Sequence, residues 1–258
     1  MSESQDERPI IYDLSDGIAT VTLNRPDRLN ALNGELRLGL FDAFKAFEED
    51  DSAFVAIITG SGRAFCAGAD LKEMAATGMG IPDRNFSPML GRNVHVSKPV
   101  IAAVNGLALA GGFLLAQTCD LCIASESAEF GVTEVKRGRG VPWAVPLLWM
   151  IPQRVAMEML LTGNPVSAHR AYEIGLVNQV TSSEDLMKVA REMASEIAAN
   201  APLSVRAARR ALYSATEMGR TAAWDVADMI FEAVYRSDDA QEGPRAFTER
   251  RQPNWKGR

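Results

Sequence analysis

The first half of the chain carries short apolar runs, each about as long as a β-strand and bounded by turn residues. Two of these runs flank Ser15-Asp16-Gly17, which predicts a hairpin. Later runs are continuously apolar and do not alternate, as is typical of strands buried on both faces. The expected strands lie at residues 10–14, 18–23, 54–59, 100–104 and 121–124.

Stretches with helical spacing separate these strands. Asn33 can cap a helix over about residues 34–49, because its apolar side chains fall on one face. These side chains are Leu36, Leu40, Phe44 and Phe47. A short helix is expected near residues 70–76 and another after Gly112, whereas residues 77–88 lack periodicity and predict a surface loop. Strands that alternate with helices in this way predict an α/β fold with parallel strands.

The last quarter of the chain has a different pattern. From about Ser183 onward, apolar residues recur at helical spacing in residues 183–199, 202–218 and 221–236. We therefore expect an α/β core over residues 1–195 and a C-terminal helical region over residues 196–258.

Composition and charge narrow the class of protein. The chain has 258 residues, of which 47% are hydrophobic and 23% charged, as in ordinary globular proteins. Its net charge of −6 favours neither nucleic acid nor an acidic membrane surface as a partner. The start of the chain is polar, without the pattern of a signal peptide, and the three cysteines are an odd number. Both features predict a cytoplasmic protein with free thiols.

The stretch NGLALAGGFLLA, residues 105–116, is the most unusual segment of the sequence. It belongs to a charge-free run, Val100–Cys119, that is just long enough to span a bilayer. The run also contains Asn105, Gln117 and Thr118, and a buried strand followed by a buried helix would be equally apolar. We favour that second interpretation, in which the first half of the stretch completes a buried strand.

Two glycine-rich turns follow predicted strands. The first, Gly106 to Gly112, is not a phosphate-binding loop, because Phe113 and Leu114 replace the required Lys and Ser/Thr. A helix that begins here would still offer unpaired N–H groups, although tight packing explains the glycines equally well. The second turn, Gly60–Asp70, follows another strand. Two such turns can each direct one donor at a single oxygen, as in an oxyanion hole.

Several other polar residues are candidates for chemistry. Cys119 and Cys122 form a CxxC, but they lie between a helix and a strand, so a buried structural pair is favoured over a redox or zinc site. His95 is interpreted as a structural residue and His169 as an exposed one. Glu134 lies in the partly apolar segment EFGVTEV. Burial would raise its pKa for proton transfer, while an ion pair with Lys136, Arg137 or Arg139 is the simpler interpretation.

Four blocks of sequence together resemble the crotonase, or enoyl-CoA hydratase/isomerase, superfamily. They are NRPDRLNALN, GRAFCAGADLKEM, SKPVIAAVNGLALAGGFLLAQTCDLCIASESAEFGVTEV and AMEMLLTGNPVSAHRAYEIGLVNQV, and they occur in the order typical of that family. The resemblance implies a crotonase-like spiral of ββα units and a C-terminal helical part used in trimerisation, with trimers that pair into hexamers. It also implies an acyl-CoA substrate, an enolate intermediate, no metal and no cofactor apart from the coenzyme A of the substrate.

The resemblance assigns roles to individual residues. The two oxyanion N–H groups match Ala67 and Gly111. The segment that recognises coenzyme A matches Ala67, Gly68, Ala69, Asp70 and Leu71. Arg28 matches a position where a basic residue meets the phosphates of coenzyme A.

The chain departs from the hydratases at one of their two glutamates. The second glutamate matches Glu134, but the first would fall at position 114, where this chain has Leu114. Two carboxylates hold the water of hydration, whereas one suffices to shift a double bond. The segment after Glu134 also diverges, so that Pro142 and Trp143 could reshape the acyl pocket. Arg137 or Arg139 could face an acidic acyl group or pair with surface carboxylates.

Three functions follow from the residues and the resemblance. The first is hydration or isomerisation of an enoyl-CoA, with Glu134 as the single acid/base. The second is another crotonase reaction: decarboxylation, thioester hydrolysis or C–C cleavage. The third is acyl-CoA binding without turnover, against which the retained Glu134 and the two donor turns argue.

Overall fold

A six-stranded sheet forms the centre of the computed structural model, which describes residues 8–78 and 80–258. Its strands lie in the order β1-β2-β3-β5-β7-β10. The first pair is the predicted antiparallel hairpin, and each later neighbour in the sheet is parallel. The strands are β1 (Ile10–Ser15), β2 (Ile18–Leu23), β3 (Val55–Gly60), β5 (Val100–Val104), β7 (Leu121–Ser125) and β10 (Gln179–Thr181).

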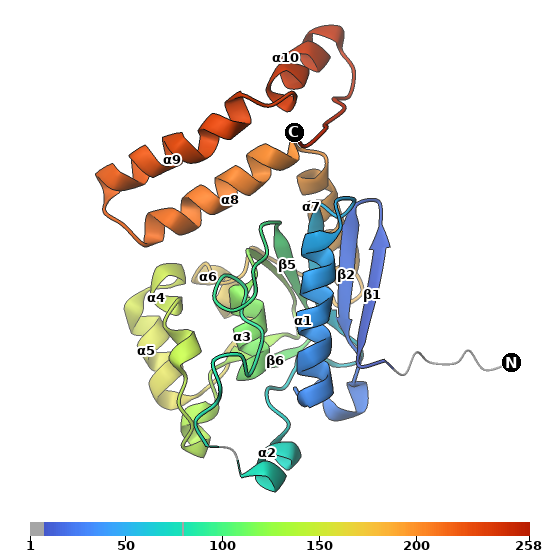
Figure 1. Ribbon diagram of the computed structural model, residues 1–258. Helices are drawn as coiled ribbons and strands as arrows, with labels where there is room; N and C mark the ends of the chain where they lie inside the picture. The colour runs from blue at the N-terminus through green and yellow to red at the C-terminus, as the bar shows by residue number, and fades with distance from the viewer. Residues whose placement is uncertain (1–7, 79) are drawn as a thin grey trace, which may run out of the picture.

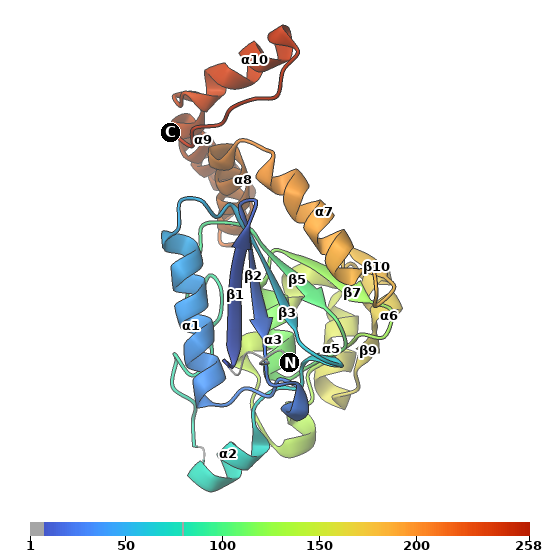
Figure 2. The ribbon, with the colours of Figure 1, turned by 90° about the vertical axis from the view of Figure 1, so that its right-hand side faces the viewer.

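Both faces of this sheet are covered, which explains why its central strands are continuously apolar. In β3, Ile57 packs in the cluster that includes α7 (Leu186–Ala198), whereas Ile58 packs in the cluster that includes α1 (Gly34–Glu49). Figure 2 shows the sheet between these two helices. Successive buried side chains of a strand point to opposite faces of the sheet, and one helix packs on each face.

Helix α1 forms as its pattern predicts. The side chain of Asn33 caps it by accepting a hydrogen bond from the amide of Leu36 at 3.1 Å. Its predicted apolar face is fully buried. At the other end, the buried ammonium of Lys98 donates to the carbonyl oxygens of Phe47 and Asp50, which complements the negative end of the helix.

A second, four-stranded sheet was not predicted from the sequence. It consists of β4 (Ala64–Cys66), β6 (Leu107–Leu109), β8 (Glu129–Gly131) and β9 (Val166–Ser167). Strand β5 therefore ends at Val104, and the apolar stretch after Asn105 begins a new strand in the other sheet, so the expectation that it completes a buried strand is wrong. The chain turns at Gly106, where a Cβ would lie 2.3 Å from the carbonyl oxygen of Arg63.

The two sheets are connected by a repeated unit. A strand of the first sheet, a strand of the second sheet and then a helix follow one another in β3-β4-α2 (α2, Leu71–Thr77) and again in β5-β6-α3 (α3, Gly111–Thr118). Short helices follow β8, and α6 (Ala168–Glu173) leads into β10. The repetition is the ββα spiral that the resemblance implied.

The C-terminal helices confirm the helical pattern of the last quarter. The three expected segments form α7, α8 (Pro202–Thr216) and α9 (Arg220–Tyr235), and a further helix, α10 (Asp239–Glu249), was not predicted. In Figure 1 α8 and α9 lie side by side at the top, and α2 lies at the opposite end of the molecule. The guanidinium of Arg209 connects α8 to the core by an ion pair with Asp120 at 2.8 Å. Within the described residues, no helix combines the length and apolarity needed to cross a bilayer.

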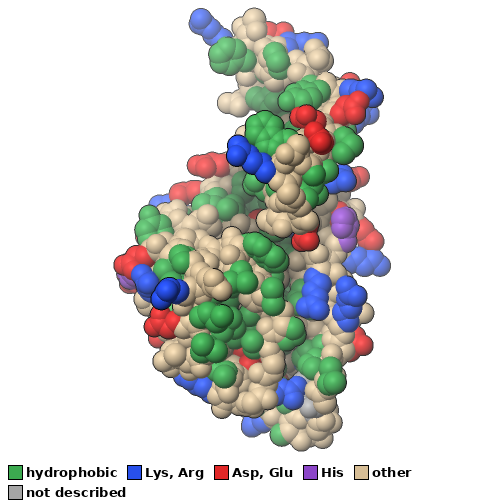
Figure 3. All heavy atoms as spheres, turned by 90° about the vertical axis from the view of Figure 1, so that its left-hand side faces the viewer, with side chains coloured by type: hydrophobic (Ala, Val, Ile, Leu, Met, Phe, Trp, Pro, Cys, Tyr) green, Lys and Arg blue, Asp and Glu red, His purple; other side chains and the backbone are tan. Residues whose placement is uncertain are grey.

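Helices α4 (Leu147–Met150) and α5 (Gln153–Thr162) present apolar side chains to the surface. Figure 3 shows hydrophobic side chains grouped on the face of the molecule that carries these helices. The exposed apolar side chains of the two helices are Leu148, Trp149, Met150, Met157 and Leu161.

Candidate active site

The two glycine-rich turns meet in the structure. Gly68 has φ of +99°, and a Cβ on it would lie 2.8 Å from the Cβ of Ala110. A Cβ on Gly112 would lie 2.0 Å from the carbonyl oxygen of Cys66. Only glycine allows the backbones to approach this closely, so the structure supports the packing interpretation of these glycines.

Helix α3 begins with a strained residue. Ala110, its N-cap, has φ of +51° and ψ of −120°, which is rare for a residue with a Cβ. The amide of Ala110 donates to the carbonyl of Gly131 at 2.8 Å and so fixes the turn. Gly111 follows as the first residue of the helix, where an amide has no intrahelical partner. In the described part of the chain, the amide of Gly111 donates no hydrogen bond.

The amide of Ala67 is engaged elsewhere. It donates to the carbonyl of Leu29 at 3.0 Å, which corrects the prediction that it is an oxyanion donor. Asn30 secures this contact, because its buried side chain donates to the carbonyls of Ser61 and Ala64. The sequence match could not show it, because the contact joins segments almost forty residues apart.

The amide of Ala69 is the better candidate for the second donor. Over residues 8–78 and 80–258, it makes no hydrogen bond. A Cβ on Gly111 would lie 3.8 Å from its nitrogen. The amides of Ala69 and Gly111 are therefore two open donors at the meeting point of the turns.

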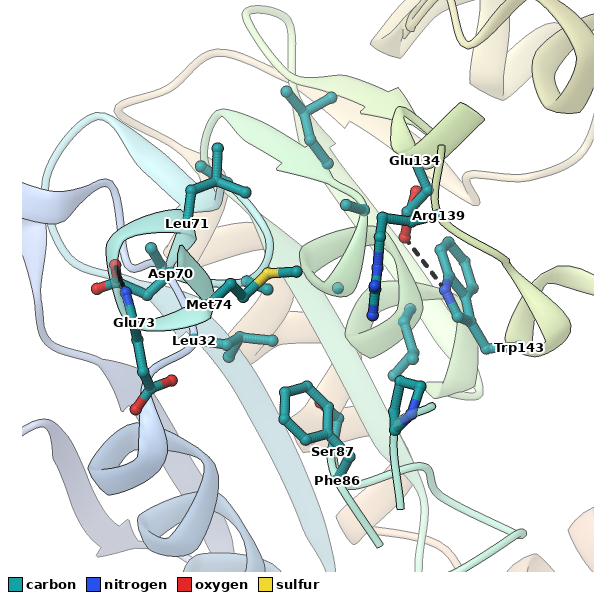
Figure 4. A pocket seen from close by; sticks show the side chains of 18 of the residues that line it. Leu32, Asp70, Leu71, Glu73, Met74, Phe86, Ser87, Glu134, Arg139 and Trp143 are labelled. Atoms are coloured by element: carbon teal, nitrogen blue, oxygen red, sulfur yellow. Dashed lines mark hydrogen bonds between the residues drawn. The ribbon is translucent and has the colours of Figure 1, made fainter. Parts of the chain in front are cut away.

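A cleft of about 1290 Å³ opens beside these turns. Figure 4 shows Glu134 and Trp143 on one side of it, and residues of α2 on the other. All but one of the site residues expected from the sequence line the cleft, Gly68 being the exception. They are Arg28, Ala67, Ala69, Asp70, Leu71, Gly111, Leu114 and Glu134.

Glu134 begins the short 3-10 helix η2 (Glu134–Arg137) and is partly buried. Its Oε1 accepts a hydrogen bond from the indole nitrogen of Trp143 at 3.2 Å (Figure 4). Its Oε2 is buried and has no hydrogen-bond partner among the described residues. Burial raises the pKa of Glu134 above its usual value, although its own amide, Trp143 and the charge of Arg137 oppose the rise.

The three nearby cations do not form the ion pair that the sequence suggested for Glu134. Lys136 donates to the side chain of Asn164 at 2.8 Å, and Arg139 donates to the carbonyl of Gly80 at 3.1 Å. In the part of the chain that the structure describes, no cation lies within 4 Å of the carboxylate of Glu134. The carboxylate is therefore held by an indole N–H rather than by a neutralising charge.

The wall of the cleft where the first glutamate of a hydratase would lie is apolar. Leu114 is 5% exposed and lines the cleft from α3. Trp143, in the short helix η3 (Pro142–Ala144), packs edge-on against Phe113 at 6.1 Å between ring centres. The sequence indicated that Trp143 shapes the pocket, but no pattern in it showed the contact with Glu134.

The other carboxylates of the cleft have structural partners. Asp70 caps α2 and pairs with Arg25 at 3.2 Å, and Glu73 pairs with Arg37 at 3.1 Å. Arg28 is exposed at the end of the 3-10 helix η1 (Pro26–Arg28).

The loop after α2 forms another wall of the cleft. Residues 80–85 are exposed, as predicted, but the chain then turns inward, and residues 87–90 are buried. Phe86 lines the cleft, and the guanidinium of Arg37 lies over its ring, 4.1 Å from the ring centre. The prediction of a surface loop over residues 77–88 is therefore wrong for Ser87 and Pro88, which are buried where Met89 and Leu90 enter the core.

The remaining candidates lie outside the cleft. Cys119 and Cys122 are buried free thiols, as expected for a structural pair, and burial raises the pKa of Cys122 to about 12. His169 is exposed on α6. His95 is also exposed, 3.9 Å from Glu48. The structure, over its described residues, brings no three His, Cys, Asp or Glu side chains together as a metal site would require.

Comparison with known proteins identifies the family. Residues 13–258 match the family described as enoyl-CoA hydratase/isomerase. The chain belongs to this family. It is 38% identical to the (E)-benzylidenesuccinyl-CoA hydratase of Thauera aromatica, over 96% of this chain and 99% of that one. It is 36% identical to the 2,3-dehydroadipyl-CoA hydratase of Escherichia coli K12, over 93% and 96% of the two chains.

Solved structures of the enoyl-CoA hydratase/isomerase family share the fold. An enoyl-CoA hydratase from Mycobacterium tuberculosis H37Rv superposes with a TM-score of 0.90 at 37% identity, over 98% of this chain and all of that chain. The fold of this family member is thus the crotonase fold that the sequence blocks implied.

Proposed function

We propose that the protein moves a proton at the carbon next to the thioester carbonyl of an unsaturated acyl-CoA, with Glu134 as the single acid/base. The observation that carries the proposal is Oε2 of Glu134, a buried carboxylate oxygen without a protein partner in the described residues, on the cleft that the two glycine turns border. Carboxylates in such surroundings are typical proton-transfer groups.

The amides of Ala69 and Gly111 supply the second requirement of the reaction. A proton next to a thioester carbonyl is weakly acidic, so the negative charge that develops on the carbonyl oxygen must be stabilised. Two preorganised N–H groups at the start of α3 and in the adjacent turn can do so, since neither has another partner in the described residues. Loss of one such donor typically costs about 3 kcal/mol of transition-state stabilisation.

With one carboxylate, a shift of the double bond is the simplest reaction. Glu134 takes a proton from C2 of a 3-enoyl thioester, which gives a dienolate, and returns that proton to C4, which gives the 2-enoyl thioester. No water, metal or redox cofactor enters this sequence, and coenzyme A is part of the substrate. Leu114 offers no second carboxylate to hold a water.

Hydration of a 2-enoyl thioester is the second candidate. Several relatives that resemble the chain over most of its length are named as hydratases, among them those from Thauera aromatica and Escherichia coli. If this chain hydrates, Glu134 must hold the water with the help of groups other than a carboxylate at position 114.

A panel of acyl-CoA thioesters separates these candidates. The purified protein is incubated with 2-enoyl and 3-enoyl thioesters of several chain lengths, and products are separated and weighed by mass spectrometry. Isomers of unchanged mass support the double-bond shift, and products heavier by one water support hydration. Absence of any conversion, together with tight binding of the thioesters, would support a binding protein instead.

We also propose that the protein forms trimers or pairs of trimers, as the family resemblance implies. The support is that α8 and α9 extend from the core with large exposed apolar side chains, such as Leu212, Trp224 and Met229. Sedimentation equilibrium of the purified protein tests the assembly, and a monomer at micromolar concentration would contradict it.

A further inference from the structure

Helix α3, which begins in the glycine-rich turn from Gly106 to Gly112, also holds Trp143 in place. The side-chain amide of Gln117 donates to the backbone carbonyl of Trp143 at 2.9 Å. One turn earlier, Phe113 packs edge-on against the indole, with an angle of 89° between the ring planes. Gln117 is 4% exposed, so its end of the hydrogen bond is buried. The indole is thus fixed at its backbone and at its ring.

The fixed indole makes the two oxygens of Glu134 unequal. Oε1 accepts the indole N–H, whereas Oε2 is buried and has no partner among the described residues. A donor on one carboxylate oxygen restricts rotation of the group and disfavours a proton on that same oxygen. The other oxygen is then the one that can gain and lose a proton.

We propose that Trp143 is a positioning residue, which Gln117 holds in place, and that it fixes Glu134 so that Oε2 exchanges the proton with the substrate. This inference rests on the proposed role of Glu134 as the acid/base. Leu114 and Phe113 form an apolar wall beside Glu134 and offer it no polar group. The indole of Trp143 therefore orients the carboxylate of Glu134. Gln117 contacts the backbone of Trp143 and acts only through it.

Few charged groups surround Glu134 and Trp143, so a change in the titration of Glu134 can be attributed to Trp143. Helix α3 has no charged residue. On the element of Glu134 itself, Arg137 is the charge that acts on the carboxylate, and Lys136 is bonded to Asn164. Arg139 lines the same cleft, and Arg154 and Glu158 of α5, which packs against η2, are exposed.

The test replaces the indole donor and keeps an aromatic ring. Trp143→Phe should lower kcat about tenfold, the effect of one lost hydrogen bond to a charged group, with KM nearly unchanged. The acidic limb of its pH–rate profile should move to higher pH, because the carboxylate has lost a donor that stabilises it. Gln117→Met should also lower kcat and move the acidic limb to higher pH, but both changes should be smaller than in Trp143→Phe. Trp149→Phe, at an indole 60% exposed on the neighbouring helix, should change neither.

A second readout does not depend on turnover. Tryptophan emission of the wild type, followed from acidic to neutral pH, should contain a titrating component that disappears in Trp143→Phe and also in Glu134→Gln. Persistence of that component in Trp143→Phe would overturn the contact. A wild-type kcat and pH profile in Trp143→Phe would overturn the positioning role, even where Glu134→Gln is inactive. Full activity of Glu134→Gln would instead refute the proposed function.

Discussion

Gly68 and Ala110 pack against each other where the two turns of the site meet: a Cβ on the glycine would lie 2.8 Å from the Cβ of the alanine. Both residues have positive φ, +99° and +51°. The pair joins the turn that carries the amide of Ala69 to the turn that carries the amide of Gly111. The spacing of the proposed oxyanion donors therefore depends on the absence of a side chain at position 68.

Gly68→Ala should consequently damage both stability and activity. The added methyl meets Ala110 and the carbonyl of Leu109, and alanine also disfavours the backbone conformation, so we expect a loss of about 3 kcal/mol in the free energy of unfolding. Urea denaturation measures this loss. Turnover should fall by more than the unfolded fraction explains, because the two donors are displaced.

Gly91→Ala is the matched control for this experiment. Gly91 also has positive φ, +79°, but nothing lies within 4 Å of the position that its Cβ would take. It should lose only about 1 kcal/mol, from backbone strain alone, and keep its activity. Equal losses of unfolding free energy in the two variants would show that the contact with Ala110 does not contribute to stability.

Glu134→Gln should abolish turnover and leave binding intact. The amide keeps the size of the side chain and can still accept the indole N–H of Trp143, but it cannot take up a proton. Acyl-CoA affinity, measured by calorimetry, should change little, while kcat should fall by a factor of about 100 or more. Glu158→Gln, at an exposed glutamate of α5, serves as the control and should retain activity. Substantial turnover by Glu134→Gln would exclude a single-base mechanism.

The same substitution should stabilise the protein in a pH-dependent way. Burial raises the pKa of Glu134, so the folded protein binds this proton more tightly than the unfolded chain does. Stability is therefore lost as pH rises from the ordinary glutamate pKa through the raised pKa of the folded state. Glu134→Gln removes that loss, so its Tm should exceed that of the wild type at neutral pH and approach it under acid conditions. A Tm difference that does not change with pH would contradict the buried carboxylate.

The sequence revealed most of the fold because its strands are buried on both faces. Residues 54–59 and 100–104 were continuously apolar and became the centre of the first sheet, and the face of α1 followed helical spacing. The second sheet was missed because its strands have only two or three residues each, too few to show a period. Strand β6 also follows β5 after two residues and so merged with it in the pattern.

The candidate site was predictable where it depends on local sequence and not where it depends on distant contacts. The two glycine turns and Glu134 were found from residue types and from the resemblance. The choice between the amides of Ala67 and Ala69 depends on the carbonyl of Leu29, and the partner of Glu134 is Trp143 rather than a nearby cation. Neither contact leaves a signal in one sequence, because both are set by how separate turns pack.

Leu114→Glu tests whether the missing carboxylate decides the reaction. Leu114 lines the same cleft as Glu134 and is 5% exposed, so a glutamate there would face the acyl group together with Glu134. Two carboxylates can hold a water, so the ratio of hydrated to isomerised product from crotonyl and 3-enoyl thioesters should rise. Burial of the new carboxyl should also destabilise the protein, which thermal melts would record. Leu114→Met keeps the volume without the charge, and its product ratio should match that of the wild type. If both variants give the wild-type ratio while remaining folded, position 114 does not contact the reacting carbons, and the reaction must be set elsewhere in the cleft.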